Sequence, residues 1–205
     1  MSTIGRAAAM IVVLVSTLSG CLSIETSVTF EDRESGTIEM EYRIREQDIV
    51  EDRVDSPPGM LPLPVSEREV RRAASGIDQL DLERYSSDTG DGIRVVRTRL
   101  SFQSLAALNE FYGAGSETPA IYFEDDSYMQ RVFNGFDQPI DDESRSFFEM
   151  AFPDSYLKFA VSLPEEIREV ESGSRVSERE AEWTIELEDV AEETEPLYWR
   201  VSMDP

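Results

Sequence analysis

Two kinds of side chain in this sequence could do chemistry: a single cysteine, Cys21, and several clusters of carboxylates. Histidine is absent, which removes the usual general base, the serine–histidine and cysteine–histidine nucleophile systems and the commonest transition-metal ligand. The carboxylates at 124–126 (EDD) and 137–143 (DQPIDDE) could serve a glycosidase or a calcium site, but a chain with 43 acidic residues produces such clusters by composition alone. Segment 88–92 (DTGDG) lacks the ligand spacing of an EF-hand. We therefore predict solvated turns, with no catalytic residue, no metal ligand and no cofactor.

The residues before Cys21 have the pattern of a targeting segment. Arg6 gives a positive start, 7–15 (AAAMIVVLV) is an unbroken apolar run, and small and polar side chains follow it at 16–20. Nine apolar residues form a helix that rises only about 14 Å, against a hydrocarbon core of about 30 Å. A cleaved signal peptide at 1–20 is therefore favoured over a retained transmembrane anchor.

Leu18, Ser19, Gly20 and Cys21 resemble the lipobox of bacterial lipoproteins, with leucine three positions before the cysteine and small residues between them. The resemblance implies that a diacylglyceryl group alkylates the Cys21 thiol, that a peptidase cuts before Cys21, and that the new amine can be acylated as well, for example with palmitate. Two chains hold a protein at a membrane stably, whereas one binds only marginally. The alternative is a free or buried thiol after an ordinary secretory cut. The expected location is the bacterial cell envelope, on the exported side of a membrane.

Composition restricts the partners. With 43 acidic and 19 basic residues the formal net charge is −24, and loss of Arg6 with the signal peptide makes the chain one unit more negative. Nucleic acid is excluded as a partner because arginines alternate with glutamates and form no basic stripe. A single cysteine also excludes an internal disulfide, so the exported domain must be stabilised by its core alone. The acidic excess is interpreted as a solvated surface, with a cation-binding surface as the alternative.

Hydrophobic patterning predicts an α+β fold, mainly an antiparallel sheet built from hairpins with two short helices packed on it, in one domain spanning 21–205. Expected strands are 24–30, 38–44, 80–85, 93–102, 157–163, 181–187 and 197–201, with a short hairpin near 121–133 and an irregular proline-rich loop at 55–64. In 38–44, Ile38, Met40, Tyr42 and Ile44 alternate with charged residues, which predicts one buried face.

The two helices are expected at 66–75 and 104–112. Ser66 and Ser104 are the predicted N-caps, and Gly113 is the predicted stop. The first helix should pack on the sheet through Val70, Ala73 and Ala74. Four aromatic residues near the end are expected in the core of the sheet: Phe159, Trp183, Tyr198 and Trp199.

Several segments also resemble the LppM-like lipoprotein domain of bacteria, a domain of unknown function. A strand, a glycine turn and a second strand follow the cysteine, FQSLAALNEFY stands at 102–112, and VSLPEEIREVESGSRVSEREAEWTI stands at 161–185. The last segment carries most of the resemblance, since a strand ending in Leu-Pro is linked through Ser-Gly to a strand around Trp183. Members of that family often end in a transmembrane helix and a basic tail, whereas this chain stops at WRVSMDP, so anchoring is expected to depend on Cys21 alone. The family offers no established catalytic residues to carry over.

Two functional hypotheses follow. The first is a non-enzymatic, lipid-anchored envelope protein that binds an apolar ligand such as a lipid, or a partner protein; the second is an acidic hydrolase that uses paired carboxylates. A hydrolase should hold two carboxylates in one cleft, whereas a binding module should show an apolar groove. Because only Leu22 and Ser23 separate Cys21 from the first expected strand, a tether of about 10 Å should keep the domain on the lipid headgroups. Lipid handling is ranked above protein docking for this reason.

Overall fold

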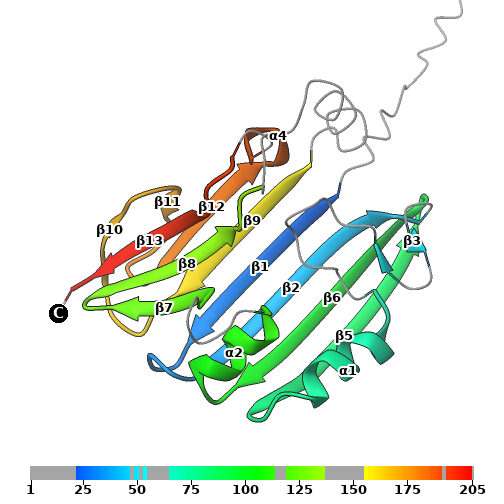
Figure 1. Ribbon diagram of the computed structural model, residues 1–205, viewed down its shortest axis with the longest axis horizontal. Helices are drawn as coiled ribbons and strands as arrows, with labels where there is room; N and C mark the ends of the chain where they lie inside the picture. The colour runs from blue at the N-terminus through cyan, green and yellow to red at the C-terminus, as the bar shows by residue number, and fades with distance from the viewer. Residues whose placement is uncertain are drawn as a thin grey trace, which may run out of the picture.

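The computed structural model describes residues 22–46, 49–50, 53–54, 65–113, 119–136, 155–190 and 193–204, which form two main sheets and short helices (Figure 1). The larger sheet has seven strands, in spatial order β11 (Ser174–Arg175), β12 (Glu180–Glu186), β9 (Tyr156–Ser162), β1 (Ser23–Phe30), β2 (Gly36–Arg45), β6 (Ile93–Phe102) and β5 (Leu80–Gly90). The smaller sheet has the order β10 (Ile167–Val170), β13 (Leu197–Met203), β8 (Ser127–Phe133) and β7 (Ile121–Glu124). A two-stranded pair, β3 (Ile49–Val50) and β4 (Arg53–Val54), completes the strands of the described residues. The predicted α+β class is confirmed.

The β1–β2 hairpin follows from the alternation in its sequence. The two strands pair antiparallel with Val28 opposite Ile38 and Ile24 opposite Tyr42. Ile38 and Tyr42 are fully buried, while Glu39 between them is exposed. The predicted buried face of β2 is therefore confirmed. The parallel pairing of β1 with β9 makes the sheet mixed, and the sequence did not indicate it.

The β5–β6 hairpin turns at an Asp-Gly pair. Asp91 and Gly92 both have positive φ, 53° and 77°, as a two-residue turn of type I′ requires. This turn was predicted, but β5 runs on to Gly90, further than expected. A register shift between Leu82 and Arg84 places a bulge in this edge strand. Such a bulge discourages pairing of the edge with another chain.

Both expected helices form, with the expected caps. In α1 (Glu67–Ser75) the Ser66 side chain accepts a hydrogen bond from the Glu69 N–H, and in α2 (Leu105–Phe111) Ser104 accepts from Ala107. The predicted packing face of α1 is correct for Val70 and Ala74, which are buried, but wrong for Ala73, which is exposed. A third helix, α4 (Leu187–Val190), follows β12 directly and was not predicted.

The three expected strands near the end of the chain lie in different sheets. β9 and β12 are neighbours in the larger sheet, whereas β13 pairs with β8 and β10 in the smaller one. The prediction of aromatic core residues here is confirmed for Trp199 and Phe159 and wrong for Tyr198, which is 44% exposed. Tyr198 and Trp199 are adjacent on one strand, so they face opposite sides of the smaller sheet.

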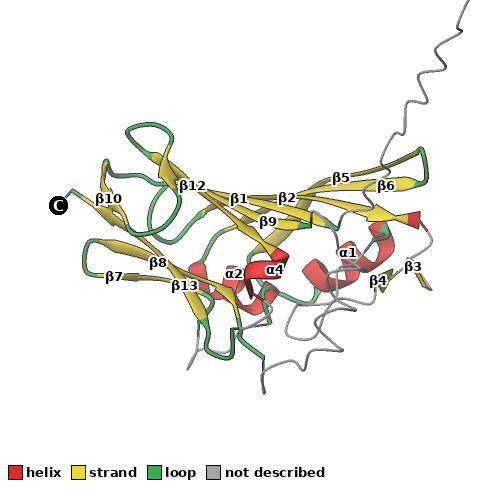
Figure 2. Cartoon of the chain, turned by 90° about the horizontal axis from the view of Figure 1, so that it is seen from above, coloured by secondary structure: helices red, strands yellow, loops and turns green. Residues whose placement is uncertain are grey.

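The helices and the smaller sheet all lie on one side of the larger sheet (Figure 2). We name that side of the larger sheet the inner face and the opposite side the outer face. Phe30 links the two layers, because its ring makes edge-to-face contacts with Phe102, Phe123 and Tyr128 at centroid distances of 5.6, 5.2 and 5.7 Å. The hydrophobic core therefore lies between the inner face and the elements that cover it.

Some sequence predictions fall on residues that the structure does not describe. These are the signal peptide at 1–20, Cys21, the proline-rich loop at 55–64 and the carboxylates at 137–143. Among the residues that are described, no helix is long and apolar enough to cross a membrane.

Candidate functional site

The predicted anchor precedes the described residues, but the residue after it is informative. Leu18, Ser19, Gly20 and Cys21 lie outside the description, while Leu22 is 5% exposed and its N–H donates a hydrogen bond to Ser155 Oγ at 3.0 Å. Ser23 is already part of β1. The expected tether of two flexible residues is therefore wrong, because both residues are fixed in the fold. The described part of the domain therefore begins directly after Cys21.

The middle of the inner face carries a row of side chains that crosses six strands. The strand registers align these residues one beside the next, and we name them the central row: Trp183, Phe159, Thr26, Met40, Thr98 and Tyr85. Trp183, Met40 and Tyr85 remain partly exposed. In the next row toward Leu22, Ile24, Tyr42 and Val96 are all buried. Part of the apolar surface of the inner face thus reaches solvent in the central row, and Leu82, opposite Leu100, is partly exposed as well.

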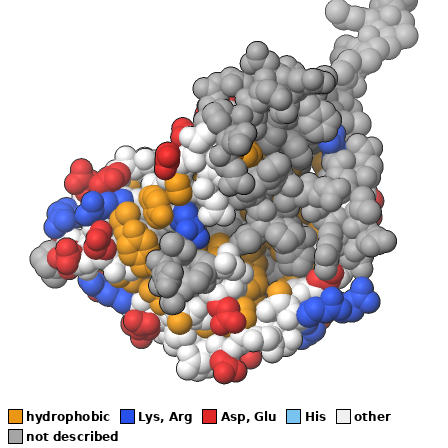
Figure 3. Space-filling model, in the orientation of Figure 1, with side chains coloured by type: hydrophobic (Ala, Val, Ile, Leu, Met, Phe, Trp, Pro, Cys, Tyr) orange, Lys and Arg blue, Asp and Glu red, His pale blue; other side chains and the backbone are white. Residues whose placement is uncertain are grey.

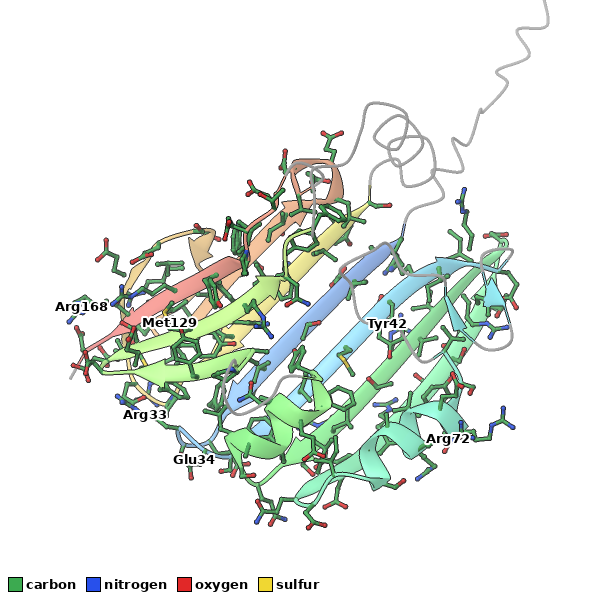
Figure 4. The ribbon with its side chains drawn as sticks, viewed as in Figure 1. Arg33, Glu34, Tyr42, Arg72, Met129 and Arg168 are labelled. Carbon is green, nitrogen blue, oxygen red and sulfur yellow. The ribbon has the colours of Figure 1, made fainter. Side chains whose placement is uncertain are left out.

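Two buried hydroxyl groups, those of Tyr42 and of Thr98 in the central row, are neighbours. Tyr42 is 0% exposed and Thr98 is 4% exposed; the Thr98 hydroxyl is the hydrogen-bonding neighbour of Tyr42 Oη, and neither oxygen has a further partner within the described part of the chain. The two residues are diagonal neighbours on β2 and β6, because Tyr42 pairs with Val96 and Met40 pairs with Thr98. Figure 4 labels Tyr42 on the inner face, in the middle of the larger sheet. Burial of a hydroxyl is costly, and the contact between these two hydroxyls offsets part of that cost.

The environment of these hydroxyls also changes their acidity. Burial raises the pKa of Tyr42 well above its usual range, a hydrogen bond with the Thr98 hydroxyl offsets part of this shift, and the charge of Tyr85 adds to it. Tyr85 itself is satisfied, since its hydroxyl donates to the Val65 carbonyl at 2.7 Å. Tyr42 is therefore a neutral phenol at any physiological pH.

Tyr112, the C-cap residue of α2, has a buried hydroxyl without a partner in the described part of the chain. The ring of Tyr112 is partly exposed, but its oxygen is buried and makes no hydrogen bond to the described residues. Burial raises the pKa of Tyr112 as well. Nearby Tyr128, in contrast, donates to Gln130 Oε1 at 2.7 Å. The core between the two sheets thus contains a few neutral polar atoms among its apolar side chains.

The outer face is different in chemistry. A cavity of about 370 Å³ lies over β9, β1, β2, β6 and β5, and its charged lining is Glu25, Glu39, Glu41, Arg84, Arg97, Arg99 and Lys158. Thr26, Met40 and Thr98 contribute backbone to its floor, because their side chains point to the inner face. Small residues, Ser27 and Ala160, stand between the charged ones and leave the surface hollow.

Most of the charged side chains that line this outer cavity form ion pairs. Glu41 lies 3.0 Å from Arg43 and 2.6 Å from Arg97, and Arg99 lies 2.5 Å from Glu39. Hydrogen bonds to Glu83 and Glu39 raise the pKa of Arg99 further. Each of these exposed ion pairs contributes little to the free energy of folding, and the outer face is a solvated, charged surface.

The carboxylates singled out in the sequence do not converge on a cleft. Residues 124–126 form the turn between β7 and β8, where Asp126 lies 3.6 Å from Arg33. Segment 88–92 comprises the exposed end of β5 and the two-residue turn at Asp91 and Gly92. Among the described residues no group of cysteine, aspartate and glutamate side chains is arranged to hold a metal ion.

The smaller sheet also exposes apolar side chains. In Figure 3 they gather over β7, β8 and β13. Tyr122, Met129 and Tyr198 share the side of these strands that faces away from the larger sheet. Tyr122 lies close to Tyr198 and Arg200: burial and the charges of Tyr198 and Glu124 raise its pKa, while Arg200 lowers it. We name Tyr122, Met129 and Tyr198 the aromatic patch.

Sequence reasoning found part of the central row. The alternation in β2 predicted the inward side chains of Met40 and Tyr42, and Trp183 was expected in the sheet. Thr98 was missed, although its position between Val96 and Leu100 in an alternating strand is a signal that it faces the core. A threonine on a buried strand face is a polar group that needs a partner.

Comparisons with known proteins add one structural neighbour. No protein-family model and no curated protein matches this chain. Five chains of solved structures match, among them the folded domain of LppM from Mycobacterium tuberculosis, determined by NMR. That alignment has 13% identity and a TM-score of 0.47 and covers 91% of this chain and 93% of the LppM chain.

Proposed function

We propose that this protein is a lipid-anchored, non-enzymatic binding module of the bacterial cell envelope, and that its ligand is an apolar molecule such as a lipid, held against the inner face. The single observation that supports the ligand class is the central row. Its Trp183, Met40 and Tyr85 side chains stay partly exposed on the face that otherwise forms the hydrophobic core. Apolar side chains that reach solvent beside a core are the surface that an apolar ligand covers most favourably.

The position of the anchor supports a lipid rather than a soluble ligand. Acylated Cys21 would lie one peptide bond from buried Leu22, so the domain would be held against the headgroups with almost no freedom. A module in that position can exchange an apolar ligand directly with the bilayer, without carrying it through water.

The ligand is tested on protein extracted from its own membrane in a mild detergent. Native mass spectrometry should show the mass of the acylated chain and, on a fraction of the molecules, an additional mass that organic solvent removes and that is identified as a lipid. Protein that carries its acyl groups but never a removable lipid would contradict the proposed ligand.

The anchor is tested with Cys21→Ser. The variant should keep its signal peptide or appear in the soluble fraction, and it should leave the membrane in a carbonate wash that does not release the wild-type protein. Equal retention of both proteins would show that Cys21 is not the anchor.

Docking of a partner protein is the second candidate, and the aromatic patch favours it. Tyr198 is 44% exposed and lies beside Tyr122 and Met129, residue types that are enriched in protein interfaces. Tyr198→Ser should reduce co-purification of such a partner and leave the lipid content unchanged. Met40→Ser should reduce the lipid content and leave co-purification of the partner unchanged.

The acidic hydrolase is the remaining alternative. Glu25 and Glu41 are directly opposite on β1 and β2 and line the outer cavity together. Glu41 is paired with two arginines and Glu25 accepts a hydrogen bond from Tyr156 at 2.7 Å, which are structural roles. If the outer cavity were catalytic, Glu25→Gln would abolish function in cells; we expect the variant to be active.

A further inference from the structure

We propose that the domain contacts the bilayer through the side of the smaller sheet that faces away from the larger sheet, and that the lipids it contacts there are anionic. The surface consists of the aromatic patch together with Arg131 and Arg200, and we name these residues the docking face. The inference rests on the lipid anchor of the proposed function, and it adds which side of the domain faces the membrane. It does not depend on the ligand that the inner face binds.

The docking face is continuous across β7, β8 and β13. The strand registers place Tyr198 beside Arg131, Arg200 beside Met129, and Met129 beside Tyr122. Residues directly opposite each other on paired strands point to the same side of a sheet. Tyrosine rings and arginine side chains therefore share one surface, on which Tyr198 is 44% exposed.

These residue types are suited to the boundary between water and lipid. Tyrosine has an apolar ring and a polar hydroxyl, and it is enriched at membrane–water interfaces for that reason. Arginine is attracted to anionic headgroups and can bind a phosphate group through two parallel hydrogen bonds. Within the described part of the chain no carboxylate forms an ion pair with Arg131, so its charge is available to a headgroup.

The carboxylates near the docking face lie at its margin. Glu124 stands at the β7–β8 turn, where β8 begins, and Glu171 follows β10 and lies 3.6 Å from Arg200. Arg131 is close to the opposite end of β8. The end of the smaller sheet at which β8 stops and β13 begins is therefore the cationic end of the docking face.

The same end of the smaller sheet is connected to the residue that follows the anchor. Leu22 donates to Ser155 Oγ, and the Ser155 carbonyl accepts from Leu187, the first residue of α4, at 2.9 Å. After α4, the Glu193 carbonyl accepts from Phe136, just past the end of β8, also at 2.9 Å. In Figure 1 the start of β1, α4 and the end of β8 all point to the same end of the molecule. The anchor and the docking face can therefore meet one membrane.

The outer face of the larger sheet is a poorer membrane surface. The described lining of its cavity contains no aromatic side chain, and its three glutamates are Glu25, Glu39 and Glu41. Contact with headgroups would remove solvated ion pairs from water and bury little apolar area in return. Docking through the smaller sheet keeps the outer face in water. It also turns the inner face toward the bilayer, because the smaller sheet and the inner face lie on the same side of the larger sheet (Figure 2).

The test measures which side of the full, acylated protein approaches the bilayer in vesicles. Because the lipid blocks Cys21, one introduced cysteine can carry the fluorophore nitrobenzoxadiazole. The labelled positions are Met129→Cys on the docking face and Thr184→Cys as the matched control on the outer face, where Thr184 is exposed. The vesicles are dioleoylphosphatidylcholine with or without dioleoylphosphatidylglycerol, and they contain a phosphatidylcholine with a nitroxide close to its headgroup, which quenches fluorophores at the membrane surface.

In anionic vesicles we expect the Met129→Cys label to be quenched and the Thr184→Cys label to stay bright. With the first label in place, Arg131→Gln should lower the ratio of docked to undocked domain about fivefold, the effect of one cation near an anionic surface. Arg84→Gln is the matched control, since it removes an exposed arginine of the outer face and should leave the quenching unchanged.

The aromatic contribution is tested with the same label. Tyr198→Ser should reduce the quenching in neutral and in anionic vesicles, because it removes the ring that enters the interface. Val176→Ser removes the other large apolar side chain that is exposed among the described residues, and it should have no effect because Val176 lies outside the docking face.

Three results would overturn the inference. Stronger quenching of the Thr184→Cys label than of the Met129→Cys label would place the outer face at the membrane. Quenching of neither label would exclude the docking face as the membrane surface, and loss of a co-purifying protein from Tyr198→Ser would then assign the aromatic patch to a partner protein. Quenching of the Met129→Cys label that Arg131→Gln leaves unchanged would refute the preference for anionic lipid.

Native mass spectrometry of the same preparation tests the proposed function separately. An acylated protein that docks as expected but carries no removable lipid would refute the proposed ligand and support the docking face. A chain without acyl groups would refute the anchor, and the inference with it.

Discussion

The side-chain amide of Asn109 bonds both backbone groups of Ile121: its Nδ2 donates to the Ile121 carbonyl at 2.7 Å, and its Oδ1 accepts from the Ile121 N–H at 2.8 Å. The same oxygen accepts from Ala120, and Nδ2 also donates to Leu105. Asn109 therefore joins α2 to the first strand of the smaller sheet in the way that a neighbouring strand would.

Asn109→Ala should destabilise the domain by about 3 kcal/mol or more, because it leaves buried backbone groups of Ile121 and Ala120 without partners. The measurement is the free energy of unfolding from urea titration. Glu110→Ala, at the next and exposed position of α2, is the control and should change stability by less than about 0.5 kcal/mol. Similar values for both variants would show that the amide does not join the layers.

Tyr42→Asp and Glu41→Lys separate the two faces of β2. The first change places a charge where the side chain is fully buried and should cost about 3–5 kcal/mol. The second acts on the outer face, where it breaks exposed ion pairs to Arg43 and Arg97 and should cost about 1 kcal/mol. Thermal unfolding distinguishes them, and equal melting temperatures would contradict the assignment of the inner face.

Local patterns in the sequence predicted most of the individual elements, but not how they assemble. Four local features were predicted and are present: the alternation in β2, the Asp-Gly turn of β5–β6, and the serine caps of α1 and α2. Each of them depends on residues that are close in the chain. The parallel pairing of β1 with β9 joins segments more than a hundred residues apart, and nothing in either strand encodes it.

The candidate site shows the same limit. The face of Met40 was predictable, but the central row exists only because six strand registers align Trp183 with Tyr85 across the sheet. Asn109 did leave a signal in the sequence, since asparagine is a poor helix former and directly follows Leu108 on the apolar side of α2. A polar residue at such a position needs a tertiary partner, and Ile121 provides it.

Gly36→Ala should disrupt the β1–β2 hairpin, because a Cβ at this position would lie 2.0 Å from the Thr29 carbonyl oxygen, a backbone atom that cannot move aside. We expect a loss of about 2–4 kcal/mol in the free energy of unfolding. Gly76, after α1, has open space around its Cβ position and φ of −88°, so Gly76→Ala is the matched control and should be nearly neutral. A neutral Gly36→Ala would show that the hairpin is less closely packed than described.

The stability that Asp32 gives to the β1–β2 turn depends on pH. Its Oδ1 accepts hydrogen bonds from Glu34 N–H, Ser35 N–H and Ser35 Oγ, and these bonds lower the pKa of Asp32 below its unfolded value of 3.8. A lowered pKa stabilises the fold at higher pH, and the contribution is lost as the pH falls through the folded value.

Asp32→Asn should therefore lower the melting temperature more at about pH 7 than at a pH low enough to protonate the wild-type carboxyl. Asp81→Asn, an exposed position on β5, is the control at both pH values. A constant difference between wild type and Asp32→Asn across this range would contradict the role of the ionised carboxylate.

A flexible insertion between Cys21 and Leu22 separates lipid exchange from protein docking. The insertion has to precede Leu22, because Leu22 is buried against Ser155 and Ser23 is the first residue of β1. Twenty Gly/Ser residues would give a root-mean-square reach of about 25 Å and would release the domain from the headgroups. If the inner face exchanges lipid with the bilayer beneath it, the insertion should impair function in cells while the protein remains membrane-bound and keeps its melting temperature. Docking to a partner above the membrane would tolerate the longer reach or benefit from it.

A twenty-residue insertion of rigid proline-rich sequence serves as a second variant, since it holds the domain farther away and should impair lipid exchange more than the flexible one does. Full function of both variants would exclude direct exchange with the bilayer and leave the aromatic patch as the surface to investigate.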